Sequence, residues 1–340
     1  MRILILGGTG FVGRHLAAAL AKAGHALRVP TRGYAHGRDL LVLPTVTLFQ
    51  ADIHDDASLD RLVQGCDAVV NLIGILHGDR GKPYGAAFAR AHVTLPQRVA
   101  ASCRRHGVRR FVQMSALGAD SAGPSMYLRS KGDGEAAVRQ VWADVQAQGE
   151  AVAPGFQPAE QPHTRPGIQP QAQPAVDPPW TLVRPSVIFG ADDNFTNLFA
   201  RLARRFPVLP LAGAQARLQP VHVQDVAAAI VAMLGTSQAA GKTYELAGPQ
   251  VYTLEEVAGL CARWSGHPRL VCRMPDGLGR LQASMLAMLP GTPLMSPDNL
   301  DSLRVDNVAS GPMAPELGVV PASMDAVVPG YLGRGLGVYF

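Results

Sequence analysis

The sequence predicts an α/β protein with a doubly wound parallel sheet and a smaller C-terminal α/β lobe. Three observations favour this fold. Short apolar runs alternate with helix-like stretches along the first part of the chain, and a glycine-rich turn follows the first of these runs. The chain also has 340 residues, more than one hydrophobic core usually supports, so a large domain with an appended part is expected.

The alternating pattern sets the expected order of elements. The expected strands are Arg2–Leu6, Ala26–Pro30, Val46–Ala51, Ala68–Ile73, Arg110–Met114, Trp180–Phe189, Lys242–Leu246 and Arg269–Arg273. The expected helices are Val12–Ala23, Ser58–Gln64, Phe88–His106, Val223–Leu234, a helix that Thr253 and Glu256 cap and that runs to Ser265, and Leu278–Leu289.

The composition excludes several classes of function. The net charge is +5, but no basic run contains interleaved aromatic residues, so no nucleic-acid partner is expected. The four cysteines are scattered without a CxxC pair, which suits a reducing cytosol and predicts no metal site. Neither a signal peptide nor a membrane span is expected. We therefore expect a cytoplasmic protein, with peripheral association at the inner face of the plasma membrane as the alternative.

The glycine-rich turn carries the strongest functional signal. It reads GGTGFVG, directly after the first strand and at the start of a helix. Gly7 permits the tight turn, Gly10 lets the backbone approach a diphosphate, and Gly13 allows close packing of helix on strand. This is the pattern of a Rossmann-type dinucleotide site, although a glycine turn that binds nothing would share it. The other loop residues expected to contact the dinucleotide are Thr9, Phe11 and Val12.

The ends of the next strands suggest how the adenosine end is held. Arg32 stands where an NAD-selective site usually carries an acid, and a guanidinium can clamp a 2′-phosphate, so NADP(H) is favoured over NAD(H). An ordinary solvated arginine is the alternative. Asp52 and Ile53 are expected at the adenine, unless Asp52 caps the next helix. Ile73 and Gly74 are expected beside the adenosine ribose, although a turn glycine would look the same.

A candidate reaction centre follows the fifth strand. Tyr127 and Lys131 are four residues apart, on one face of a predicted helix. An ammonium group beside a phenol lowers the pKa of the phenol, so Tyr127 is expected to act as a general acid or base. Ser115 is expected to hydrogen-bond the substrate oxygen. The alternative is that Lys131 only holds the nicotinamide ribose and no turnover occurs.

These motifs resemble those of the extended and atypical short-chain dehydrogenase/reductase superfamily, of the NAD-dependent epimerase/dehydratase type. The resemblance is carried by GGTGFVG, by Ser115, Tyr127 and Lys131, and by RPSVIFG at 184–190. YLRSKGDGE at 127–135 and PVHVQDVA at 220–227 are most similar to the NADPH-binding accessory subunit family of respiratory complex I and its bacterial relatives. The resemblance implies a tightly held NADPH and a role near ubiquinone or its biosynthesis.

The resemblance also assigns further positions. It implies that Pro185 and Val187 lie against the nicotinamide end, and that Asp225 lies at the junction of the two lobes. His222 is expected to be a packed histidine at that junction. One position departs from the family pattern: His92 stands where many active relatives carry an asparagine of a proton relay, which puts full dehydrogenase activity in doubt.

Three functions remain open on the sequence. The first is an NADP(H)-dependent oxidoreductase whose substrate is unknown and could be quinone-related. The second is a non-catalytic NADPH-binding subunit or assembly factor that docks on a membrane or respiratory complex, through the apolar residues Leu281, Met285, Leu286, Met288 and Leu289; these residues could equally form the core of the small lobe. The third is a nucleotide-sugar epimerase/dehydratase, with Arg201, Arg204 and Arg205 as candidate phosphate ligands.

The expected organisation has four parts. Residues 1–145 form the dinucleotide-binding domain. Residues 146–179, with a proline at every fourth position from 154 to 178, form a disordered or polyproline-like insertion. Residues 180–190 form the last strand of the sheet. Residues 191–340 form mainly the substrate or partner lobe, with about 221–246 returning to the first domain.

Overall fold

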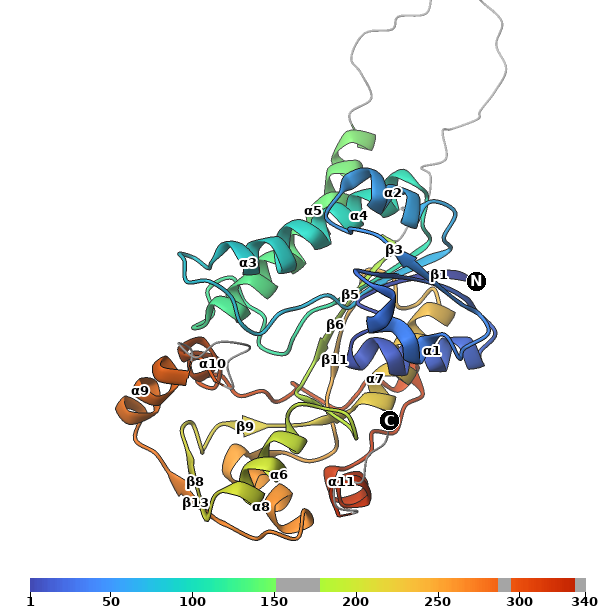
Figure 1. Ribbon diagram of the computed structural model, residues 1–340. Coiled ribbons are helices and arrows are strands. Elements are labelled where there is room, and N and C mark those ends of the chain that lie inside the picture. The colour runs from blue at the N-terminus through green and yellow to red at the C-terminus, as the bar shows by residue number, and fades with distance from the viewer. Residues whose placement is uncertain (151–177, 287–294, 334–340) are drawn as a thin grey trace, which may run out of the picture.

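The computed structural model describes residues 1–150, 178–286 and 295–333. Its centre is a seven-stranded parallel sheet in the order β11-β6-β5-β4-β1-β2-β3 (Figure 1). Strand β1 lies inside the sheet, between β2 and β4, because the chain builds outward to β3 and then returns to add β4 on the other side of β1. The strands are β1 (Arg2–Leu6), β2 (Ala26–Thr31), β3 (Val46–Gln50), β4 (Ala68–Asn71), β5 (Arg110–Met114), β6 (Trp180–Pro185) and β11 (Thr243–Leu246).

Helices cover both faces of this sheet, as the doubly wound prediction requires. The alternation along β1 sends Ile3 and Ile5 into one core and Leu4 and Leu6 into the other. The first core is closed by α1 (Phe11–Lys22) and α7 (Val223–Gly235). The second is closed by α2 (Asp56–Val63), α4 (Leu95–Arg105) and α5 (Met126–Glu150). A 3-10 helix, η1 (Tyr34–Leu40), follows β2.

The helix expected at Phe88–His106 is divided. A short α3 (Ala86–Phe88) leads into one wide π-helical segment, η2 (Ala89–Thr94), which continues as α4. Such wide turns are rare and are often found at functional sites. This one contains the buried His92.

The strand expected at Trp180–Phe189 is also divided. Strand β6 ends at Pro185. The amide of Ser186 still donates to the carbonyl of Leu246 in β11 at 2.9 Å, whereas its hydroxyl and the amide of Val187 donate to the side chain of Asn307. The chain resumes as β7 (Ile188–Phe189), which pairs with β10 (Val221–His222). The strand beside β6 at one edge of the main sheet is β11, which follows much later in the chain, and β3 forms the other edge.

The C-terminal lobe packs on its own core. It includes α6 (Thr196–Arg205), β8 (Val208–Leu211), β9 (Arg217–Leu218), β12 (Tyr252–Thr253), α8 (Leu254–Trp264), β13 (Leu270–Arg273), α9 (Asp276–Leu286), α10 (Pro297–Ser302), η3 (Pro315–Leu317) and α11 (Met324–Leu332). The capping box of Thr253 and Glu256 opens α8, which confirms that prediction. Apolar residues from α6, α8 and α11 meet in this core.

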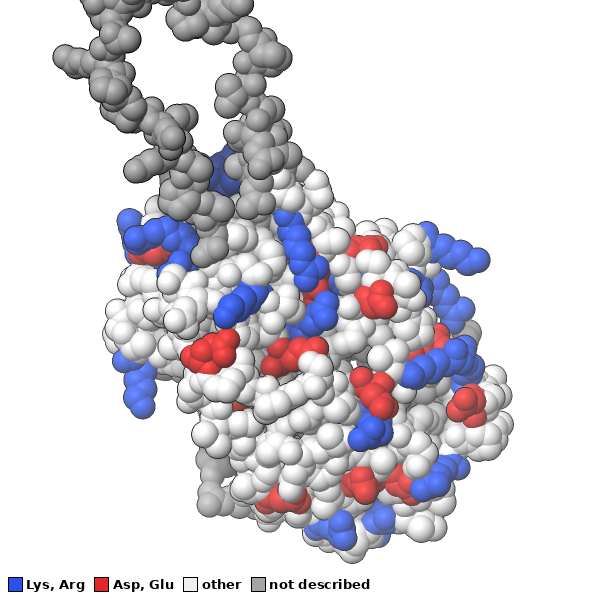
Figure 2. Space-filling view, turned by 180° about the vertical axis from the view of Figure 1, so that it is seen from behind, with Lys and Arg blue, Asp and Glu red and all other residues white. Residues whose placement is uncertain are grey.

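Two predictions fall partly outside the described residues. Most of the proline-rich insertion does, although α5 extends to Glu150, past the position where the insertion was expected to begin. The expected helix Leu278–Leu289 corresponds to α9, but Met288 and Leu289 are outside the described range. Within that range, no helix is long and apolar enough to cross a membrane. On the face shown in Figure 2, basic and acidic side chains are interspersed.

Candidate functional site

The glycine turn joins β1 to α1 as the sequence predicted. Gly7 has a left-handed backbone, with φ of +81°, and its carbonyl accepts the amide of Gly10 at 3.0 Å. A Cβ atom on Gly13 would lie 2.2 Å from that carbonyl oxygen, so only glycine allows the helix to pack this closely. No side chain caps α1 at Gly10, which leaves the start of the helix available to an anion.

Neighbouring segments surround this turn. A Cβ atom on Gly37 of η1 would lie 3.4 Å from Cγ2 of Thr9, and one on Gly190 would lie 3.2 Å from Cζ of Phe11. Just after Gly190, Asp192 forms an ion pair with Arg14 at 2.6 Å and contacts His15. The start of α1 thus lies between η1 and the segment that follows β7.

Two residues expected at the adenosine end follow β2 and β3. Arg32 is exposed directly after β2 and takes part in no ion pair within the described residues. Asp52 is exposed and accepts the amide of His54 at 2.8 Å, whereas the residue that caps α2 is Asp55. The capping role considered for Asp52 therefore belongs to Asp55, three residues later.

The segment after β4 connects the two halves of the candidate site. A Cβ atom on Gly7 would lie 3.3 Å from Cδ1 of Ile73. One on Gly74 would lie 3.2 Å from Nζ of Lys131 and 3.6 Å from Nε2 of His92. Ile73 and Gly74 thus run from the phosphate turn to the candidate reaction centre. Ile53 packs, partly buried, against the core on the α2 side of the sheet.

Tyr127 and Lys131 lie one turn apart on α5, as expected. Nζ of Lys131 is 5.9 Å from the centre of the Tyr127 ring and donates to the carbonyl of Met114 at 3.3 Å. Desolvation raises the pKa of Tyr127 to about 12 and lowers the pKa of Lys131 to about 8. The expected lowering of the phenol pKa is therefore absent here, since burial outweighs an ammonium group that points towards a carbonyl. Tyr127 is protonated at neutral pH.

Ser115 bonds within the protein. Its hydroxyl donates to Oε1 of Glu135 at 2.6 Å, and its expected hydrogen bond to a substrate oxygen stays a prediction. The Glu135 carboxylate is buried and also accepts two hydrogen bonds of 2.7 Å from Arg184 and one of 3.0 Å from Arg139. Sequence reasoning missed Glu135, although its position four residues after Lys131 was a usable signal.

His92 is bonded at both ring nitrogens. Nε2 accepts the amide of Ile75 at 3.0 Å, so Nδ1 carries the proton and donates to Oγ of Ser130 at 2.8 Å. Ser130 in turn donates to the carbonyl of Tyr127 at 2.8 Å. Burial lowers the pKa of His92 to about 2. A neutral ring with both nitrogens occupied holds three segments together, and it could relay a proton only by breaking one of these bonds.

The remaining sequence-predicted residues lie where the two lobes meet. The carbonyl of Pro185 accepts the amide of Leu117 at 3.0 Å, and the amide of Val187 donates to Asn307 at 2.9 Å. The ring of His222 lies 5.3 Å from that of Phe189, as a packed junction histidine would. Asp225 accepts the amide of Ala322 at 2.8 Å, and so ties α7 to the segment before α11.

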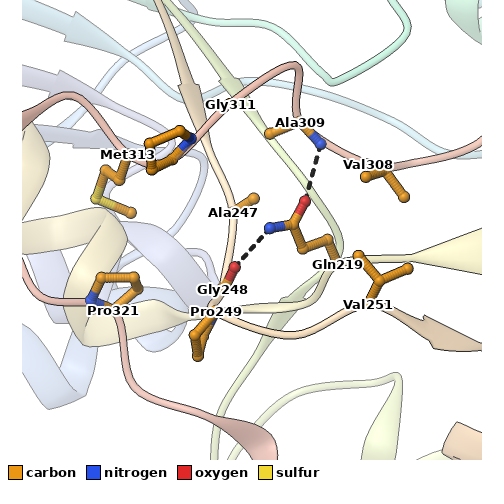
Figure 3. A pocket seen from close by; sticks show the side chains of 11 residues that line it. Gln219, Ala247, Gly248, Pro249, Val251, Val308, Ala309, Gly311, Met313 and Pro321 are labelled. Atoms are coloured by element: carbon orange, nitrogen blue, oxygen red, sulfur yellow. Dashed lines mark hydrogen bonds between the residues drawn. The ribbon is translucent and has the colours of Figure 1, made fainter.

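A separate pocket of about 500 Å³ lies beyond the end of β11 (Figure 3). Its one amide side chain, Gln219, donates to the carbonyl of Gly248 at 2.7 Å and accepts the amide of Ala309 at 3.0 Å. Both polar ends of that side chain are therefore occupied within the protein. The residues of the phosphate turn and of the candidate reaction centre do not line this pocket.

Comparison with known proteins agrees with this geometry. Residues 3–130 match the model of the NAD dependent epimerase/dehydratase family. The chain is 30% identical over 324 residues to NADH dehydrogenase [ubiquinone] 1 alpha subcomplex subunit 9, mitochondrial, of Arabidopsis thaliana, covering 90% of this chain and 70% of that protein. It is 30% identical over 278 residues to ceramide reductase of Caulobacter vibrioides, covering 81% and 74%.

Among solved structures, Pal from Bacillus thuringiensis superimposes with a TM-score of 0.69, covering 99% of both chains at 14% identity, which shows a common fold. The fold and the site define a nicotinamide-dinucleotide-binding protein. The chain belongs to the NAD dependent epimerase/dehydratase family, in the part of it that includes the complex I subunits to which the chain is similar.

Proposed function

We propose that the chain is an NADP(H)-dependent oxidoreductase that reduces a carbonyl group. The observation that carries this proposal is the pairing of Tyr127 with Lys131 beside Gly74, at the end of a segment that begins at the phosphate turn. The coenzyme would supply a hydride to the carbonyl carbon. Tyr127, whose pKa is raised to about 12, is protonated at neutral pH and would give its proton to the carbonyl oxygen, which favours reduction.

NADP(H) is the proposed coenzyme because Arg32 is exposed after β2 and free of ion pairs within the described residues. Lys131 would hold the nicotinamide ribose, and Gly7, Gly10 and Gly13 would let backbone amides approach the diphosphate. Similarity to ceramide reductase and to complex I subunits supports an apolar substrate, either a lipid carbonyl or a quinone.

Turnover of NADPH tests this proposal. Purified protein is given NADPH or NADH with a short-chain ubiquinone analogue, a long-chain keto lipid or a nucleotide sugar. We expect NADPH oxidation with one of the first two, abolished by Tyr127→Phe while coenzyme binding persists. Tyr252→Phe, which removes a hydroxyl bonded to Asp325 away from the site, is the matched control. Equal turnover in Tyr127→Phe and wild type would disprove the mechanism.

A non-catalytic role is the second candidate, and helix α9 favours it. Leu281 and Met285 are 59% and 63% exposed, and Leu278 on the same helix is 59% exposed. They are therefore not part of the small-lobe core, which was the alternative considered for the first two. Exposed apolar side chains on one helix suit docking on a membrane or on a respiratory complex. The chain would then associate with the inner face of the plasma membrane.

Membrane fractionation separates this candidate from a freely diffusing enzyme. Leu281→Asp with Met285→Asp should release the protein from the membrane fraction. Val320→Asp, at an apolar residue that is 91% exposed elsewhere on the surface, should not. Identical distribution of all three proteins would count against docking through α9.

A further inference from the structure

The start of α5 is capped by a residue from the other end of the chain. The carboxylate of Asp298, in α10, accepts the amide of Met126 at 2.6 Å through Oδ1 and the amide of Tyr127 at 3.1 Å through Oδ2. Ser125 accepts the next amide, that of Leu128, at 3.1 Å through its hydroxyl. The first three amides of the helix, which have no partner inside a helix, are thus all satisfied.

Helix α10 is held in place by further contacts on the same side. Ser302 donates to the hydroxyl of Ser125 at 2.8 Å, so the residue that caps the third amide is itself tied to α10. The side-chain amide of Asn299 donates to the carbonyl of Leu76 at 3.5 Å, two residues beyond Gly74. The same short helix therefore contacts both the start of α5 and the segment that passes Lys131.

The environment of Asp298 makes this cap specific. Asp298 as a whole residue is only 9% exposed, and a negative charge at a helix N-terminus interacts favourably with the helix dipole. Asp301, one turn later on α10, pairs instead with Arg280 and Arg304 near the surface. Asp298 and Asp301, both in α10, thus bind different partners. Of these two acids, Asp298 is the one that bonds to α5, the helix that carries Tyr127.

We infer that Asp298 is a positioning residue: it caps α5 across the lobe junction and so fixes the backbone that carries Tyr127. The bonded amide of Tyr127 belongs to the same residue as the phenol, so a shift of this turn moves the phenol directly. The link also makes the reactive geometry depend on the C-terminal lobe being closed onto the first domain. The catalytic part of this inference rests on the proposed function; the structural part does not.

Hydrogen exchange of the full-length protein tests the structural part. Asp298→Ala should speed exchange in a peptide containing residues 126–128 about tenfold, the factor expected for loss of a helix cap. Asp298→Asn keeps one of the two acceptor oxygens and places an NH2 group at the other, so it should recover only part of the protection. Asp301→Asn, on the same helix, is the matched control and should leave this peptide unchanged. Equal exchange in Asp298→Ala and Asp301→Asn would overturn the inference.

Steady-state kinetics, with the substrate that the turnover assay identifies, tests the positioning part of the inference. Asp298→Ala should lower kcat about tenfold while KM for NADPH stays within twofold, since the phosphate turn is not touched. Asp298→Asn, which keeps one acceptor, should restore part of kcat relative to Asp298→Ala, which a general loss of folding would not explain. Faster exchange without any change in kcat would refute the positioning role. Should no substrate turn over, the exchange result still decides whether the cap exists.

Discussion

The N-termini of α1 and α5 present the same backbone chemistry and are treated in opposite ways. At α1, the capping position is Gly10 and no side chain accepts the first amides. At α5, Asp298 and Ser125 accept the first three backbone amides of the helix. A helix start can bind an anion only where the protein leaves its amides without partners. We call the N-terminus of α1 the open terminus, because no side chain accepts its first amides. We call the N-terminus of α5 the closed terminus, because Asp298 and Ser125 accept its first three amides.

The largest effect is expected at the open terminus. Gly13→Ala would place a methyl group 2.2 Å from the Gly7 carbonyl oxygen, so the turn must shift. We expect NADP(H) binding to be lost and the free energy of unfolding to fall by about 2 kcal/mol. Gly259→Ala, in α8 with open space around it, should leave binding unchanged and stabilise the protein by roughly 0.5 kcal/mol. Titration with NADPH and chemical denaturation measure both; unchanged binding in Gly13→Ala would remove the basis for the comparison.

His92 supports the closed terminus through Ser130, which donates to the carbonyl of Tyr127. We expect this support to appear in the pH dependence of the free energy of unfolding. The pKa of His92 is lowered from 6.5 to about 2 in the folded chain, so between these values the unfolded chain binds a proton that the folded chain does not. The contribution of neutral His92 to the free energy of unfolding is complete above pH 6.5. It is lost as the pH falls, by at most about 1.4 kcal/mol per pH unit. His92→Gln should flatten this slope. The control is His36→Gln, at an exposed ring, and equal slopes in both variants would argue against a neutral His92.

A smaller effect at the open terminus concerns the choice of coenzyme. Arg32→Ala should weaken NADPH binding about tenfold and leave NADH binding within twofold, because a guanidinium can pair only with the 2′-phosphate. The unfolding midpoint should not change, since the side chain is exposed. Fluorescence titration with the two coenzymes gives the ratio. An equal loss for both coenzymes would mean that Arg32 does not select between them.

The smallest effect is expected for Thr253, and it shows how much a helix cap from the adjacent residue contributes to the free energy of unfolding. Thr253 caps α8 from the adjacent position in the chain, through a capping box with Glu256. Thr253→Ala should cost about 1 kcal/mol of unfolding free energy and leave coenzyme binding and kcat unchanged. Thr253→Ser retains the hydroxyl and is the matched control. A loss of kcat in Thr253→Ala would show that capping in general, and not the link from α10, governs the reaction.

Local patterns predicted the elements that depend on neighbours in the chain. Strands Arg2–Leu6 and Arg110–Met114 were predicted with the bounds observed, because apolar runs bounded by turns identify buried strands. Gly7 and Gly13 were also found from their spacing, since that spacing reflects the geometry of a single turn.

The contacts that escaped prediction join distant segments. Asn307 accepts the hydroxyl of Ser186 and the amide of Val187 just after β6, and no local pattern near Trp180 signals this. Ser115 was assigned to the substrate because nothing near it in the chain shows that Glu135 accepts its proton. The pKa of Tyr127 was misjudged for the same reason: the spacing to Lys131 shows the ammonium group but not the degree of burial.

The position of Asp298 near the end of the chain has a consequence for biosynthesis. A ribosome completes the phosphate turn first and the sheet once β11 has emerged at Leu246, but α5 receives its cap only when α10 follows. A nascent chain can therefore hold its coenzyme site before the phenol is fixed in place. A chain released before α10 is made would contain the phosphate turn and every strand of the main sheet, but not the residue that caps the helix of Tyr127.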